Sequence, residues 1–472
     1  MAARVIRVSL FVVLPALILL SGALITPSWA SPHGLSLSQA IERGLKKSPL
    51  IKAAEFGVAA SLARTGQARS GLYPRLGIDG SFRRTTNPMW SFGMKLNQEQ
   101  ITRLDFDPKK LNNPDAINNF SATISLTYPL YNHGQTRVGI EQAGLSENAA
   151  SMRLKRARQE VIAQVTTSYL DVLLAKEYLQ VIDEALKTAK AHYHMIRDRF
   201  ASGLVVKSDL LRAEVHVADL ERQRFRALAD IKVARSALRA AMGEKSDFNF
   251  TLTSPLEPGH AVSQDLDQWI SRALALRPDL EVMRIKRQIA EKEVKKAKLA
   301  YYPGIYLSGN YEINSEELDE SATNYTVGAM VQFDIFDGYQ KKSRIAEAIA
   351  NLHRVKSAID QMKLGIEVEV RQAYFSARSA WKQISVARSA IAQAREALRI
   401  VRNRYENGLF TVVQLLGAET SLQQSKADYF RAIHDYRVAL SRLALAAGTI
   451  TDTVESTMNA AANLNTLTQQ YE

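Results

Sequence analysis

Cysteine is absent from the 472 residues of the chain, which excludes disulfide bonds, thiolate chemistry and a lipid anchor carried on a cysteine. Long apolar runs are also scarce. Only one, from residue 8 to about residue 25, approaches the roughly 20 residues that a membrane-spanning helix requires. We therefore expect no transmembrane helix in the rest of the chain. Transmembrane strands give a much weaker signal and are not excluded by this test.

Catalytic motifs are lacking as well. The sequence has no Gly-x-Ser-x-Gly, no His-Glu-x-x-His and no glycine-rich phosphate loop, so we predict no enzyme and no cofactor. His192 and His194 are neighbours in sequence, but residues two apart do not share a helical face, so no metal site is expected there. An exported enzyme remains a rival interpretation, which a measured hydrolytic activity would support.

The charge pattern is typical of solvated helices. The formal net charge is +13, which can indicate a nucleic-acid-binding protein. Here, however, lysine and arginine are spread through long helical stretches and mixed with glutamate and aspartate. Such mixing indicates exposed helix faces rather than a binding patch, so no nucleic acid is expected as a partner.

The apolar run near the N-terminus has the features of a secretory signal peptide. Arg4 and Arg7 precede it, and Ser28-Trp29-Ala30 places small residues at the positions that a signal peptidase recognises. We expect cleavage after Ala30, so that residues 1–30 are a signal peptide and the mature protein leaves the cytoplasm. An uncleaved membrane anchor is the alternative, and the shortness of the run argues against it.

A repeat of roughly two hundred residues organises the chain. Residues 37–49 match residues 266–278 at an offset of 266 − 37 = 229, whereas residues 199–204 match residues 404–409 at an offset of 404 − 199 = 205. The first copy thus carries 229 − 205 = 24 extra residues. We expect a first repeat at 31–243, a linker at 244–263, a second repeat at 264–448 and a polar tail at 449–472.

Strands are predicted by alternation within each repeat. Phe120, Ala122, Ile124 and Leu126 alternate with serine and threonine, which is the pattern of a strand with different environments on its two faces. About ten tilted residues cross a bilayer, although a soluble sandwich strand gives the same pattern. The expected strands lie at about 75–84, 119–128, 304–313 and 325–333.

Long helices are predicted by an apolar seam whose spacing alternates between four and three. In the first repeat the seam runs from Val161 to Phe200 with only Ser168 polar, and adding 205 gives its copy. A period of 3.5 residues held over this length imposes left-handed coiled-coil packing. We expect long helices at about 135–201 and 339–406, each followed by a tip and a shorter helix at 206–243 and 411–447.

Four strands cannot close a transmembrane barrel, because outer-membrane barrels begin at about eight strands and an open edge is unstable in lipid. The barrel must therefore be shared between chains. Two chains would give a lumen filled by side chains, and three would leave it open.

This arrangement resembles the TolC-like outer membrane efflux and secretion channels over about residues 35–448. The resemblance rests on the order of motifs that occur twice: Leu72-Tyr73-Pro74 and Tyr301-Tyr302-Pro303 before strands, residues 128–132 and 333–337 after strands, and the helix-turn-helix tips at 200–211 and 405–416. It implies a mixed α and β membrane protein in which three chains form a 12-stranded transmembrane β-barrel, four strands per chain, continued by a long periplasmic α-helical coiled-coil barrel.

The resemblance also implies function and partners. It implies a passive channel of a tripartite efflux or type I secretion system in the outer membrane of a Gram-negative bacterium, extending into the periplasm. A homotrimer would meet a periplasmic adaptor (a membrane fusion protein) and an inner-membrane pump of the resistance-nodulation-division or ABC type. The cargo and the pump class stay open. The alternatives are a trimeric coiled-coil stalk or adhesin, which lacks paired strands, and a diffusion porin, which lacks long helices.

The resemblance also assigns functional sites to individual positions of this sequence. The family's adaptor-docking tip maps onto Gly203-Leu204-Val205 and Gly408-Leu409-Phe410. The family's narrow entrance, lined in its best-known member by two acidic rings, maps onto Gln414 and Gly417, with Asp209 and Arg212 as their counterparts in the first repeat. Neither Gln414 nor Gly417 is acidic, which argues against acidic gating. For Asp209, a role as the N-cap of its helix is the alternative.

We also expect a loop between the two strands of each repeat. The 24 extra residues, with Trp90, Phe92, Asp105 and Asp107, would enlarge an exterior loop, since outer-membrane barrels keep their longer loops on that side. The shorter loop carries Glu316, Glu317, Asp319 and Glu320; we expect a solvated loop there, with a metal or lipopolysaccharide site as the alternative.

Overall fold

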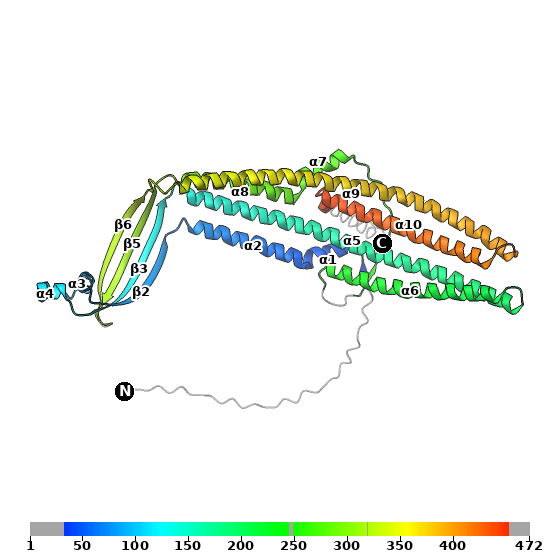
Figure 1. Ribbon diagram of the computed structural model, residues 1–472, viewed down its shortest axis with the longest axis horizontal. Helices are drawn as coiled ribbons and strands as arrows, with labels where there is room; N and C mark the ends of the chain where they lie inside the picture. Colours follow the sequence, from blue (N-terminus) through cyan, green and yellow to red (C-terminus); the bar gives the residue numbers. More distant parts are fainter. Residues whose placement is uncertain (1–32, 245–248, 319, 453–472) are drawn as a thin grey trace, which may run out of the picture.

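The computed structural model describes residues 33–244, 249–318 and 320–452. The expected signal peptide and most of the expected polar tail lie outside the described residues. The molecule is elongated, with a β-sheet at one end, a body of long antiparallel helices, and two helical hairpins whose tips form the other end (Figure 1). Within the described part of the chain, no helix combines the length and the hydrophobicity that crossing a bilayer requires.

Four helices of the first repeat each have a counterpart of equal length in the second repeat. The first repeat contains α1 (Leu37–Lys47), α2 (Pro49–Ser70), α5 (Gln135–Ala201) and α6 (Lys207–Ala241). The second contains α7 (Leu266–Leu276), α8 (Pro278–Leu299), α9 (Gln340–Glu406) and α10 (Val412–Ala446). Both α5 and α9 have 67 residues, which at 1.5 Å per residue is about 100 Å. In the first repeat α2 and α6 pack along successive parts of α5, and in the second α8 and α10 pack in the same way along α9 (Figure 1).

The sheet is formed by four antiparallel strands in the order β2-β3-β5-β6. Their bounds are β2 (Arg75–Thr85), β3 (Ile117–Tyr131), β5 (Gly304–Ser315) and β6 (Ala322–Gln332). The strands of the first repeat pair with those of the second through β3 and β5. Because β2 and β6 each have one neighbour within the described residues, both outer edges of the sheet are open.

A small parallel sheet in the middle of the body was not predicted. Its strands are β1 (His33–Leu35) and β4 (Phe250–Leu252), and β4 lies in the segment expected to be only a linker. The Tyr169 hydroxyl of α5 donates to the Leu35 carbonyl at 2.9 Å and accepts from the Ser254 amide at 3.2 Å. Strands of three residues are too short for alternation to identify them. They cover the largest apolar core, which α5 shares with α1, α6 and α10.

The extra residues of the first repeat are helical rather than an extended loop. They form α3 (Pro88–Asn97), a 3₁₀ turn η1 (Arg103–Phe106) and α4 (Pro108–Asn112) at the far end of the sheet. The Asn87 side chain caps α3. Lys95 bonds Asp105 at 2.7 Å, and the Phe92 and Phe106 rings contact edge-on with centroids 5.8 Å apart. We call residues 86–116 the helical lobe.

Candidate functional site

The two hairpin tips are built in the same way. After α5 the amide of Leu204 donates to the Arg199 carbonyl at 2.9 Å, and the amide of Gly203 donates to Phe200 at 2.9 Å. This pair of bonds is a Schellman motif, which requires a left-handed residue at its C′ position. Gly203 supplies it with φ +71°, as Gly408 does after α9 with φ +74°. A glycine therefore allows the chain to reverse at both tips.

The residues expected to dock an adaptor divide into exposed and packed positions. Leu204 and Leu409 are each 73% exposed at the extreme of the molecule. Val205 and Phe410 instead pack against an apolar group that joins the two hairpins. We call this group the tip cluster; its buried members are Ile196, Ala213, Tyr405, Val412 and Leu415.

Arg199 adds polar contacts across the tip cluster. Its guanidinium lies 5.3 Å from the centre of the Tyr405 ring and donates to the Glu406 carbonyl at 3.4 Å. Burial raises the pKa of the Tyr405 hydroxyl, so this ring is neutral. The tips of α5 and α9 are thus attached to each other by stacking and apolar contact.

The residues expected at the constriction lie on the first turns of α6 and α10. Gln414 is exposed, and its side-chain oxygen accepts from the Thr411 amide at 2.9 Å as part of a capping box. Gly417 and Arg212 are exposed one turn further on. The alternative role for Asp209 is wrong: the N-cap of α6 is Val206, and Asp209 lies three residues later, where its charge favours the positive helix end.

A buried acidic side chain that the sequence analysis missed lies next to the tip cluster. Glu419 of α10 is only 9% exposed and contacts His192 of α5. His216 of α6 lies on its other side, with Nε2 at 3.9 Å from the second carboxylate oxygen. We call these three residues the Glu419 cluster. Within the described residues, no group of three such side chains has the arrangement of a metal site.

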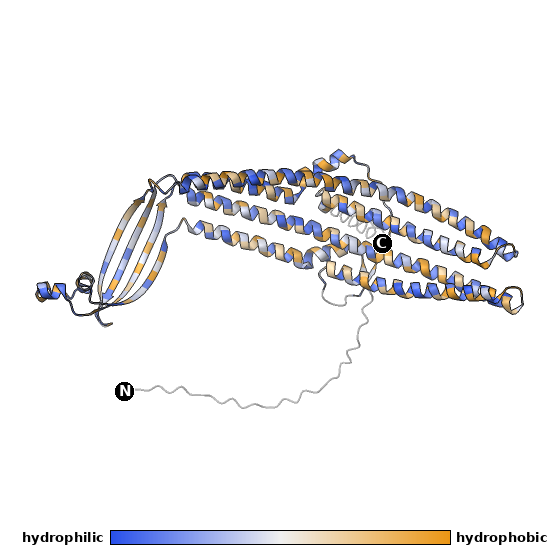
Figure 2. Ribbon diagram, in the orientation of Figure 1, coloured by the Kyte–Doolittle hydropathy of each residue, from blue (hydrophilic) through white to orange (hydrophobic). Residues whose placement is uncertain are grey.

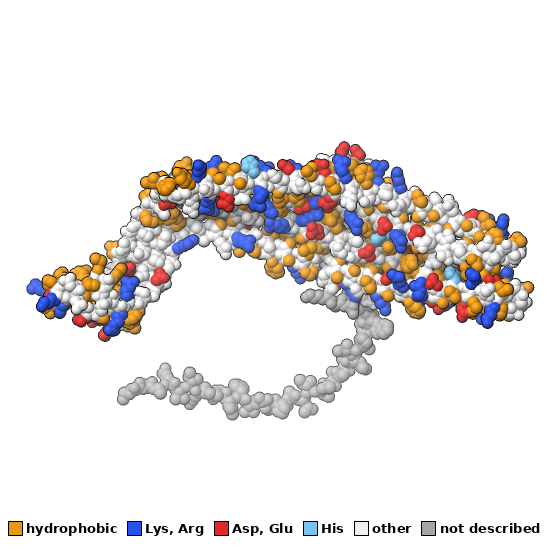
Figure 3. Space-filling view, in the orientation of Figure 1, with side chains coloured by type: hydrophobic (Ala, Val, Ile, Leu, Met, Phe, Trp, Pro, Cys, Tyr) orange, Lys and Arg blue, Asp and Glu red, His pale blue; other side chains and the backbone are white. Residues whose placement is uncertain are grey.

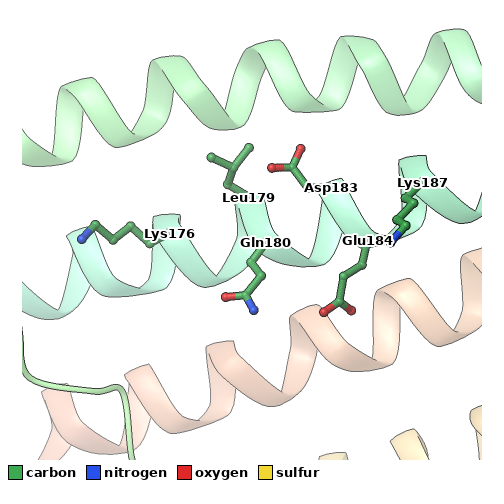
Figure 4. A pocket seen from close by; sticks show the side chains of 6 residues that line it. All are labelled: Lys176, Leu179, Gln180, Asp183, Glu184 and Lys187. Carbon is green, nitrogen blue, oxygen red and sulfur yellow. The ribbon is translucent and has the colours of Figure 1, made fainter.

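Further along α5, charged side chains reach both neighbouring helices. Figure 4 shows Asp183 pointing toward α6 and Glu184 pointing toward α10, on either side of one groove. Asp183 pairs with Arg224 at 2.7 Å, and Glu184 pairs with Lys426 at 2.5 Å. On the face seen in the space-filling view, basic and acidic side chains are mixed along the helical body, as the charge pattern predicted (Figure 3).

The sheet presents one apolar and one polar face. A row of partners across all four strands consists of Ile78, Ile124, Tyr311 and Tyr325, which are between 37% and 77% exposed. The next row is polar and consists of Asp79, Thr123, Glu312 and Asn324. This alternation continues along the strands (Figure 2). Exposed apolar side chains on one face indicate a surface that water does not cover.

In the loop between β5 and β6 the structure describes Glu316, Glu317 and Glu320, while Asp319 lies outside the described residues. Ser315 donates to backbone carbonyls of this loop, which closes it as a compact turn.

Comparison with known proteins places this geometry in context. The sequence profile of the family described as outer membrane efflux protein matches residues 40–244 and 269–449. The chain is 24% identical to Protein CyaE of Bordetella pertussis, covering 89% of this chain and 87% of CyaE. It is 21% identical to the proteases secretion protein PrtF of Dickeya chrysanthemi, covering 90% of each. The crystal structure of the Campylobacter jejuni CmeC outer membrane channel superposes with a TM-score of 0.70 at 18% identity, covering 90% of this chain and 91% of CmeC.

Proposed function

Since this chain belongs to the outer membrane efflux protein family, as the resemblance to TolC-like channels predicted, we propose that three copies form one continuous passive duct from the periplasm to the cell exterior. Proteins of this family are outer membrane channels of efflux and type I secretion systems, and this chain is such a channel. The family is a class of transport proteins. We propose accordingly that the chain catalyses no reaction.

The observation that carries the trimer is the open four-stranded sheet. Its apolar face suits lipid, but the backbone groups on the free edges of β2 and β6 would be unpaired there, at a cost of several kcal/mol for each group. Pairing β2 of one copy with β6 of the next satisfies both edges. Three copies give twelve strands, which is wide enough for an open lumen lined by the row containing Asp79 and Asn324.

The helical body prolongs this lumen. The long helices α5 and α9 lead from the sheet to the tips, so three copies supply a tube about 100 Å long. Its entrance would be ringed by Gln414 and Gly417, with Asp209 and Arg212 beside them. An entrance without acidic rings would bind multivalent cations weakly.

The exposed tips offer the adaptor its docking surface. Leu204 and Leu409 project beyond the tip cluster, and an apolar side chain at such a position is explained by a partner that covers it. We propose that Gly203-Leu204-Val205 and Gly408-Leu409-Phe410 contact a helical hairpin of a periplasmic adaptor. The adaptor would in turn join the channel to an inner-membrane pump of the resistance-nodulation-division or ABC type.

Cysteine crosslinking tests the shared barrel, because the chain has no cysteine of its own. Asp79→Cys and Asn324→Cys place thiols on the polar face of the two edge strands. With a flexible bifunctional thiol reagent, the membrane-embedded protein should give a covalent ladder that ends at three chains. Thr123→Cys with Glu312→Cys is the matched control: these residues are partners on β3 and β5 of one chain, so the product should stay monomeric. A ladder ending at two chains, or no ladder, would contradict the trimer.

A further inference from the structure

The helical lobe is attached to the polar face of the four-stranded sheet, at the end away from the long helices (Figure 1). Asn119 of β3 lies on that face, because it is an even number of residues from Thr123 of the polar row. The Gln98 side chain, at the end of α3, donates to the Asn119 side-chain oxygen at 2.8 Å. Asn119 in turn donates to the side-chain oxygen of Asn314 on β5 at 2.9 Å. Because all three amide residues are buried, the lobe covers this part of the polar face.

Further contacts place α3 across the width of the sheet. The guanidinium of Arg83, also on the polar face, lies 5.1 Å from the centre of the Trp90 ring. The Ser91 hydroxyl donates to the Thr85 carbonyl at 3.2 Å. The helix follows β2 at one edge of the sheet and contacts β6 at the other. Its 10 residues span about 15 Å, which matches the roughly 14 Å across three strand spacings.

The face of α3 that points away from the sheet is apolar and exposed. At 3.6 residues per turn, Ser91, Met94 and Gln98 share one face of this helical segment, and all three are buried. Met89 and Leu96 lie on the opposite face and are 82% and 48% exposed. The apolar face of a helix with one polar and one apolar side is normally covered by a partner.

The size of the proposed barrel brings this face close to the same face of the other copies. Twelve strands about 4.8 Å apart and tilted by about 40° form a barrel with a radius of about 12 Å. A helix with its side chains is about 10–12 Å thick. A lobe that lies on the wall therefore reaches nearly to the axis, and three lobes at one rim must touch. Each chain supplies its lobe from the first repeat, because residues 316–321 alone join β5 to β6.

We propose that the Met89 and Leu96 side chains of three copies meet on the barrel axis and plug the outer mouth of the duct. The partner that covers each lobe is thus the lobe of the next copy. This inference rests on the proposed duct and adds to it a second barrier, at the end opposite the tips. Cargo then leaves the duct only when the three lobes separate.

Cysteine crosslinking at the lobe tests this contact in outer membranes. Met89→Cys, treated with a short bifunctional thiol reagent, should give a covalent ladder that ends at three chains. Val327→Cys is the matched control. Val327 lies on the apolar face of edge strand β6 and is 78% exposed, so its side chain points into lipid and its product should stay monomeric.

Labelling from outside the cell tests whether the mouth is closed. Asp79→Cys places a thiol in the proposed lumen, on the helix side of the lobe. The probe is a maleimide on a polymer too large for diffusion porins. It should label this thiol at least about tenfold faster when Met89→Asp and Leu96→Asp are also present, because burying one such apolar side chain is worth a factor of about ten or more. Lys109→Cys, exposed on α4, should be labelled equally with and without the two aspartates.

The outcomes separate the plug from the duct. If Met89→Cys stays monomeric while Asp79→Cys with Asn324→Cys reaches three chains, the plug is overturned and the duct stands. Equal labelling of Asp79→Cys with and without the two aspartates would also overturn the plug. If neither ladder reaches three chains, the duct itself fails.

Discussion

Four glycines with nearly the same φ angle allow two effects of a glycine-to-alanine substitution to be measured separately: backbone strain and steric overlap of the added methyl group. Gly203, Gly243, Gly408 and Gly448 each follow a helix with φ between +71° and +75°. Alanine at any of them is strained by about 1–2 kcal/mol, because its Cβ crowds the carbonyl in the left-handed region. At the two tips, Gly203 and Gly408, a Cβ would meet nothing within 4 Å. At these two positions the backbone strain should account for the whole loss in the free energy of unfolding.

At Gly243 an alanine would destabilise the protein by steric overlap in addition to the backbone strain. Its Cβ would lie 2.6 Å from the carbonyl oxygen of Lys47, which belongs to the junction of α1 and α2. Backbone cannot move aside as a flexible side chain can, so we expect roughly 1–3 kcal/mol from overpacking in addition to the strain. Gly243→Ala should thus lose about 2–5 kcal/mol in total, against about 1–2 kcal/mol for Gly203→Ala.

Thermal unfolding of the purified protein, followed by circular dichroism in detergent, measures the difference. The midpoint should fall in the order wild type, Gly203→Ala or Gly408→Ala, then Gly243→Ala. Gly448→Ala should lie between the last two, since its nearest atom is the Arg277 nitrogen at 3.2 Å. Equal midpoints for Gly203→Ala and Gly243→Ala would refute the steric argument, because the angle alone would then decide.

Three further predictions concern buried charge, pH and docking. Arg277 is 5% exposed and bonds two carboxylates and a backbone carbonyl, so Arg277→Ala should destabilise the folded protein by about 3 kcal/mol or more in denaturant titration. Burial lowers the pKa of His434, but its hydrogen bonds to Asp171 and to the adjacent aspartate outweigh this, so the pKa is raised above 6.5. Its stabilisation is fully present below about pH 6.5 and is lost as the pH rises through the raised value, so His434→Gln should flatten the decline of the unfolding midpoint above that pH. Leu409→Asp should weaken adaptor binding at least about tenfold in a pull-down titration while leaving channel conductance unchanged, and Leu204→Asp should act in the same direction.

The periodic spacing of apolar residues predicted the long helices and the strands well. Alternation over ten residues identified the strands that became β3 and β6, and the 3.5-residue seam identified α5 and α9. Both patterns extend over many residues, and each further residue that fits the pattern strengthens the prediction. The fold class follows from them together with the repeat, because four amphipathic strands and two very long helices suit few architectures.

Short and non-local features escaped prediction for physical reasons. The β1–β4 pair joins residues more than two hundred positions apart through three residues each, which leaves no periodic trace. The helical lobe was expected to be a loop, although Pro88 and Pro108 each open a helix there. His192 was weighed only against His194 on its own helix. Its actual partner, Glu419, lies on α10, and only tertiary packing brings the two together.

We have proposed that the chain forms a duct whose entrance lies at the second tip. Planar-bilayer conductance of the purified protein, comparing wild type with Gln414→Asp, is the most direct test of that duct. We expect discrete small-conductance openings, with stronger block by multivalent cations in the variant, because one added carboxylate per chain would ring the entrance. Channels indifferent to Gln414→Asp would move the constriction elsewhere. The absence of channels from folded trimers would contradict the duct and favour a structural stalk.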